Sequence, residues 1–80
     1  MSGRLPSLSG RQIISALRKA GFEDAPKRGK GSHHAMFHRD WAGRARLVII
    51  PDRKDVPRGT LLAILEQAGL SISDFLVLLK

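Results

Sequence analysis

The chain has 80 residues, and its fourteen Lys and Arg against seven Asp and Glu give a formal net charge of +7 at pH 7. This length allows one small domain with a modest core. The absence of cysteine excludes disulfides, thiolate catalysis and cysteine-ligated zinc, and it suits a reducing cytoplasm. The positive charge attracts polyanions and favours a nucleic-acid partner. Because no apolar run could cross a bilayer and no signal-peptide core is present, we expect no membrane association.

The first predicted element is a helix that begins after Ser9, behind a flexible lead over residues 1–8. Ser9 and Gln12 have the spacing of a capping box. Apolar residues then recur at helical spacing, namely Ile13, Ile14, Leu17 and Ala20. We expect Gly21 to end the helix and Phe22 to fold back against it.

The middle of the chain predicts an antiparallel hairpin. Its strands cover residues 33–39 and 44–50, joined by a turn over residues 40–43. The second strand contains a β-branched run and ends at Pro51. Residues 23–28 predict a weaker first strand, which Pro26 confines to an edge.

Two further helices follow a polar loop over residues 52–59. Thr60 is expected to cap a helix that ends at Gly69, and Ser71 with Asp74 repeats the capping-box spacing before a last short helix. The order α-β-β-β-α, with a terminal helical turn, predicts a single α+β domain over residues 9–80. Its small antiparallel three-stranded sheet would carry helices on one face and leave the other face free for a partner.

Residues 27–34 carry the densest chemistry of the chain. Cations attract phosphate, glycine lets backbone approach a ligand, and histidine exchanges a proton near neutral pH. The segment therefore predicts a site that binds a phosphodiester and also cuts it. Its residues are Lys27, Arg28, Gly29, Lys30, Gly31, Ser32, His33 and His34.

RNA carries its own nucleophile, the 2′-hydroxyl, so cleavage needs a base, an acid and cations for the phosphorane charge. A histidine and the three cations of this segment supply these groups without a metal. On a strand His33 and His34 point to opposite faces, so one can line a site while the other has another role. His33 shares its side with Ala35 and Phe37, and His34 shares its side with Met36 and His38.

Other interpretations of these residues stay open. A histidine pair in a basic loop also occurs as plain surface. A metal site would have to combine His34 and His38 with Asp40, a poor ligand set on a strand, and we predict neither metal nor cofactor. Trp41, in the turn, could stack on bases. Phe37 could do the same, but we expect it to fill the core beneath the helices.

Several short motifs in a fixed order carry a resemblance over residues 9–79. They are Ser9-Gly10-Arg11, Lys19-Ala20-Gly21-Phe22, Lys30-Gly31-Ser32-His33, His38, Ile50-Pro51, Gly59-Thr60-Leu61 and residues 64–70. With these motifs the chain resembles the HicA toxins, the YcfA-like mRNA interferases of bacterial toxin–antitoxin pairs. The turn that contains Trp41 is longer than the Pro-Asp-Gly form common in that family.

The resemblance implies a fold like the double-stranded RNA-binding domain and a ribonuclease that inhibits translation by cleaving mRNA. It implies that His33, directly after Gly-Ser, is the catalytic histidine, and that a HicB antitoxin covers the site. We therefore expect Lys27, Arg28, Lys30, Gly31, Ser32 and His34 to bind RNA. The alternatives are a non-catalytic RNA-binding module and a protein-binding domain that offers a basic face to an acidic partner. His33 separates them from the ribonuclease, because binding alone needs no imidazole there.

Overall fold

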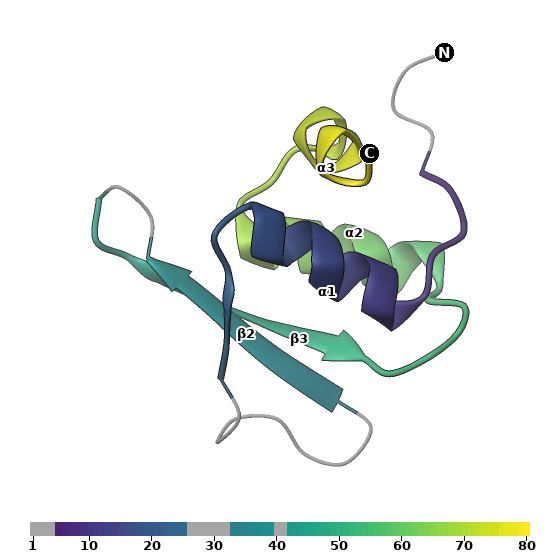
Figure 1. Ribbon diagram of the computed structural model, residues 1–80, viewed down its shortest axis with the longest axis horizontal. Coiled ribbons are helices and arrows are strands. Elements are labelled where there is room, and N and C mark those ends of the chain that lie inside the picture. Colours follow the sequence, from purple (N-terminus) through teal and green to yellow (C-terminus); the bar gives the residue numbers. More distant parts are fainter. Residues whose placement is uncertain (1–4, 26–32, 40–41) are drawn as a thin grey trace.

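Three helices and a three-stranded antiparallel sheet form the part of the chain that the computed structural model describes, residues 5–25, 33–39 and 42–80 (Figure 1). In chain order they are α1 (Gly10–Lys19), β1 (Glu23–Asp24), β2 (His33–Arg39), β3 (Ala45–Pro51), α2 (Arg58–Ala68) and α3 (Ile72–Leu78). This confirms the predicted α+β class and the order of its elements.

The sheet has the strand order β1-β2-β3. In the β2–β3 hairpin, His33 lies opposite Pro51 and Arg39 lies opposite Ala45. Strand β2 has the predicted bounds, and β3 begins and ends one residue later than predicted. Strand β1 is only two residues long; residues 26–28, which the sequence adds to it, lie outside the described residues.

The two faces of the hairpin have different environments. Met36, Val48 and Ile50 are fully buried on the face that packs against the helices, and both α1 and α2 contact β3 (Figure 1). Phe37 and Leu47 lie opposite each other on the other face, 37% and 41% exposed. The prediction that Phe37 fills the core is therefore wrong. Side chains alternate along a strand, and the helices cover only the face that Phe37 does not share.

The core joins all three helices to the inner face of the sheet. Its largest fully buried side chains include Phe75, Ile13, Leu17, Leu61 and Ile64. Burying such a side chain contributes about 1.5–3 kcal/mol, so this cluster is the main source of stability.

Leu8, which the sequence places in the lead, is part of this core. It is buried and forms an antiparallel bridge with Val56, whose N–H donates to the Leu8 carbonyl at 2.8 Å. The packed part of the chain therefore starts before Ser9.

The helix ends match the sequence predictions in four places and differ in one. The Ser9–Gln12 capping box is formed in both directions. Gly21 has a φ of 99° and Phe22 N–H donates to the Leu17 carbonyl, which closes α1 as predicted. Gly69 ends α2, and Ser71 Oγ accepts from the Asp74 N–H at the start of α3.

Thr60 does not cap α2, so this prediction is wrong. The helix begins at Arg58, directly after Pro57, and Thr60 lies within its first turn. The Pro57 carbonyl accepts the first helical hydrogen bond, from the Leu61 N–H at 2.9 Å.

None of the described helices is by itself long and apolar enough to cross a membrane. Taken together, α2 and α3 are long and apolar enough to span a membrane by length and composition alone, but the pair is bent by 95° at the break between the two helices.

Candidate functional site

His33 is the first residue of β2 and lies on the exposed face of the sheet. It lines an open pocket of about 510 Å³ together with Ile49, Pro51, Arg53 and Thr60. Strand β2 thus supplies an imidazole, the β3–α2 loop supplies a guanidinium, and the first turn of α2 supplies a hydroxyl. Such a volume lies within the range of ligand-binding pockets in proteins.

Backbone contacts hold Arg53 beside this pocket. The Gly10 N–H donates to the Arg53 carbonyl at 2.8 Å, and the Arg53 N–H donates to the Pro51 carbonyl at 3.0 Å. A Cβ atom added to Gly10 would lie 2.2 Å from the Pro51 carbonyl oxygen, so only glycine fits there. The start of α1 is therefore in close contact with the end of β3, at Pro51, which lies opposite His33 in the hairpin.

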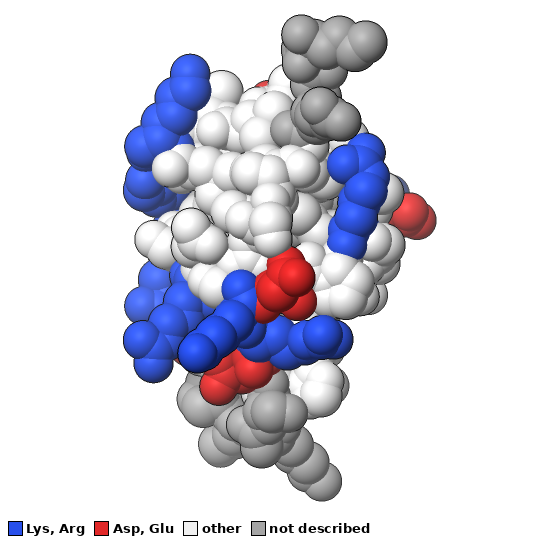
Figure 2. All heavy atoms as spheres, turned by 90° about the vertical axis from the view of Figure 1, so that its right-hand side faces the viewer, with Lys and Arg blue, Asp and Glu red and all other residues white. Residues whose placement is uncertain are grey.

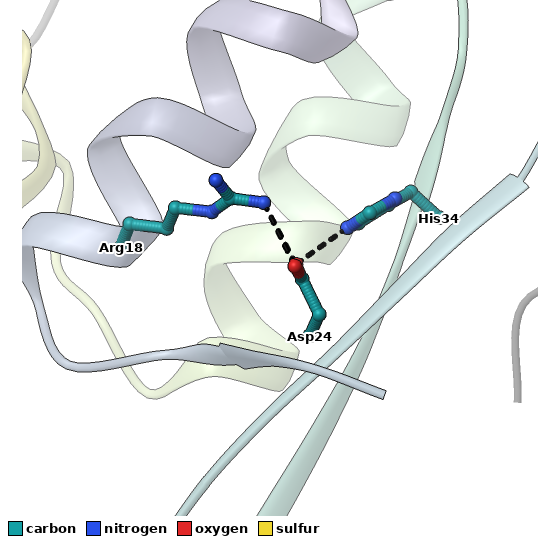
Figure 3. Close-up of polar contacts among 3 residues, drawn as sticks. All are labelled: Arg18, Asp24 and His34. Carbon is teal, nitrogen blue, oxygen red and sulfur yellow. Dashed lines mark hydrogen bonds and ion pairs between the residues drawn. The ribbon is translucent and has the colours of Figure 1, made fainter. Parts of the chain in front are cut away.

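His34 follows His33 on β2, so its side chain lies on the opposite face of the strand. There it points toward Asp24, as does Arg18 (Figure 3). Its Nε2 lies 2.8 Å from Asp24 Oδ1, and Arg18 Nη2 donates to both Asp24 oxygens at 2.9 and 3.0 Å. The hydrogen bond with His34, and then that with Arg18, hold the pKa of Asp24 below its ordinary value. His34 thereby connects β2 to β1 and α1, and the two histidines have separate surroundings.

His38 contacts the end of α1. Its Nδ1 lies 3.1 Å from the Gly21 carbonyl oxygen, and its ring is tilted against Phe22 with 5.1 Å between the centroids. Within the described part of the chain, no three His, Cys, Asp or Glu side chains form a group that could hold a metal ion.

Five of the six predicted RNA-binding residues lie in one segment before β2. Lys27, Arg28, Lys30, Gly31 and Ser32 lie outside the described residues, as do Asp40 and Trp41. Of the predicted site residues, the structure places His33 in the pocket and His34 away from it.

Sequence reasoning missed Arg53 and Thr60 as pocket residues. It treats Arg53 as one cation of a polar loop and Thr60 as a helix cap. Their position follows from the three-dimensional structure. The hairpin register places the end of β3 beside the start of β2, so the residues that follow β3 lie next to His33.

Most of the chain is similar to a known protein family. Residues 10–70 match the family model described as the HicA toxin of bacterial toxin–antitoxin systems. The matched region runs from the first residue of α1 to Leu70, just before α3. Curated proteins gave no match.

Proposed function

Because this chain belongs to the HicA toxin family of bacterial toxin–antitoxin systems, we propose that its toxic activity is metal-independent cleavage of mRNA, with His33 as general base or acid. One observation carries the proposal: an exposed histidine and an arginine from different elements line one open pocket. We also propose that residues 9–80 have a fold like the double-stranded RNA-binding domain. The described sheet, which has helices on one face only, supports this proposal.

The chemistry needs no group from outside the protein and its RNA. The imidazole of His33 takes the proton of the 2′-hydroxyl, whose oxygen attacks the adjacent phosphorus. The O2′–P bond forms, the P–O5′ bond breaks, and the leaving O5′ takes up one proton, which balances the proton that His33 removed. The products end in a 2′,3′-cyclic phosphate and a 5′-hydroxyl. Arg53 stabilises the charge that develops on the phosphoryl oxygens, since a guanidinium offers two parallel donors to phosphate.

The basic segment before His33 completes the proposed site. Lys27, Arg28 and Lys30 would bind RNA phosphates, and Gly31 and Ser32 would let the backbone approach them. His34 has a supporting role, because its imidazole is held by Asp24 rather than facing the His33 pocket.

The family implies a partner antitoxin, and we propose that a HicB-like antitoxin covers the outer face of the sheet. Phe37 and Leu47 form an exposed cross-strand pair there, and Ile49 and Pro51 extend the same face to the His33 pocket. Adjoining exposed apolar side chains are typical of protein interaction sites. A protein bound on them would also block access of RNA to His33.

The direct test is incubation of the purified protein with a long mRNA, beside His33→Ala and Arg53→Gln. We expect His33→Ala to abolish cleavage while circular dichroism and RNA binding stay unchanged, because His33 is exposed and outside the core. Arg53→Gln should reduce cleavage through loss of phosphoryl stabilisation. Retained cleavage by folded His33→Ala would remove this residue from the mechanism. RNA binding without cleavage by the unaltered protein would favour the non-catalytic RNA-binding module.

A further inference from the structure

A second cleft lies beside the His33 pocket, between the start of α1 and the loop after β3. It is lined by Ser9, Arg11, Asp52, Arg53 and Lys54. Three of these five residues are cations and one is an acid, so the cleft has a net positive charge. Figure 2 faces this side of the molecule and shows several Lys and Arg side chains gathered beside Asp and Glu.

No side chain among the described residues pairs with the cations of this cleft. Within residues 5–25, 33–39 and 42–80, the side chains of Arg11, Arg53 and Lys54 make no ion pair or hydrogen bond. Elsewhere on the surface comparable cations are engaged: Arg18 pairs with Asp24, and Lys19 donates to the Lys80 carbonyl. Unpaired cations that converge on one cleft attract an anion, and arginine is especially suited to phosphate.

The cleft is continuous with the proposed active site, because Arg53 lines both. The Gly10–Pro51 contact fixes their relative position by backbone alone. On the basis of the proposed function, we propose that this cleft is a phosphate-binding subsite, which holds the RNA backbone next to the scissile bond.

The lining of the cleft favours RNA over a protein ligand. None of its five residues has an apolar side chain, whereas the centre of a protein interface is enriched in apolar and aromatic residues. The Ser9 N–H donates to Gln12 in the capping box, and the Ser9 hydroxyl oxygen accepts from the Gln12 N–H. The attraction for a charged ligand therefore comes from the three cationic side chains.

The test compares Arg11→Gln and Lys54→Gln with Lys19→Gln, which removes the same charge at the opposite end of α1. The ligand is a single-stranded 2′-O-methyl oligoribonucleotide, which lacks the nucleophile and reports binding without cleavage. Affinity is measured at several salt concentrations. We expect each cleft variant to bind several-fold more weakly, with a salt slope smaller by about 0.7 for each lost phosphate contact. Lys19→Gln should keep the original slope.

The outcomes separate this subsite from the proposed cleavage. If both cleft variants behave like Lys19→Gln, or if they weaken antitoxin binding and leave RNA binding unchanged, the subsite is wrong. If the cleft variants lose RNA affinity but the unaltered protein cleaves no RNA, the subsite stands and the ribonuclease proposal fails. A protein that does not bind the oligonucleotide at all would overturn the subsite as well.

Discussion

Asp24 is the acidic residue on which two elements converge, since its carboxylate accepts from Arg18 on α1 and contacts His34 on β2. Both contacts favour the ionised form and lower the pKa of Asp24. Its contribution to stability is therefore fully present above the pKa of the unfolded chain. It is lost as the pH falls through the lower pKa of the folded state.

Asp24→Asn should consequently lower the Tm near neutral pH and have less effect in acid. The difference should be small, because the Asp24 side chain is 46% exposed and salt screens the pair. Thermal unfolding of both proteins across the acid range measures it. A difference that stays constant into acid would show that carboxylate ionisation is not its cause.

The two adjacent histidines should respond differently to alanine. His34→Ala should lose less cleavage activity than His33→Ala, because His34 contacts Asp24 and His33 lines the pocket. It should also lower the Tm more, through loss of the contact between β2 and β1. Cleavage rates and thermal unfolding of the two variants, measured together, check both statements. An equal or larger loss of cleavage in His34→Ala would mean that their roles are reversed.

At the scale of elements, the contact between the start of α1 and the end of β3 positions the site. Gly10→Ala should lower stability by about 1–3 kcal/mol, because its Cβ would lie 2.2 Å from a backbone oxygen and the two elements must separate. The cleavage rate should also fall, because separation of the two elements would shift Arg53 relative to His33 in the pocket that both residues line.

Gly59→Ala is the matched control for this change. Gly59 also lies in the first turn of a helix, but a Cβ there would meet nothing within 4 Å. Alanine has the higher helix propensity, so we expect no loss or a gain of up to about 1 kcal/mol. Denaturant unfolding of both variants measures the contrast, and equal effects would show that the Gly10 contact is not important.

The elements that were predicted correctly depend on local signals. The Ser9–Gln12 box, the Gly21 stop and the hairpin each involve residues close in sequence. Thr60 was assigned wrongly because residues with a hydroxyl side chain are common helix caps. In the structure Pro57, whose φ is fixed by its ring, is the residue before the first turn, so α2 begins earlier, at Arg58. The roles of Gly10 and Arg53 could not be predicted, because they depend on the approach of two segments that lie about forty residues apart in the chain.

At the scale of the whole molecule, the sheet divides a helix-covered face from an exposed one. Phe37→Ala and Leu47→Ala should weaken antitoxin binding strongly, by about 1–2 kcal/mol each if they lie at the centre of the interface. Stability should change little, since both side chains are already partly exposed. Val77→Ala is the control, because Val77 is 66% exposed on α3. Calorimetric titration with the antitoxin measures the affinity of each of the three variants. Equal affinities for Phe37→Ala, Leu47→Ala and the control Val77→Ala would show that the antitoxin binds elsewhere.

The distribution of charge over the molecule argues against a mechanism that depends on metal ions. A two-metal nuclease holds its ions about 4 Å apart with clustered carboxylates. Asp52 and Asp55 are close in sequence, but their loop also contains Arg53 and Lys54, and Asp55 accepts from the Ser7 hydroxyl.

Cleavage that starts at the 2′-hydroxyl needs proton transfer and nearby cations but no metal ion, and the His33 pocket and the adjoining cleft contain an imidazole and cationic side chains. We therefore expect full activity in excess EDTA, no cleavage of DNA, and products that end in a 2′,3′-cyclic phosphate. Analysis of the RNA ends after cleavage with and without EDTA tests all of these. Activity that is lost on chelation and restored by Mg²⁺ or Mn²⁺ would overturn this mechanism even if His33 proved essential.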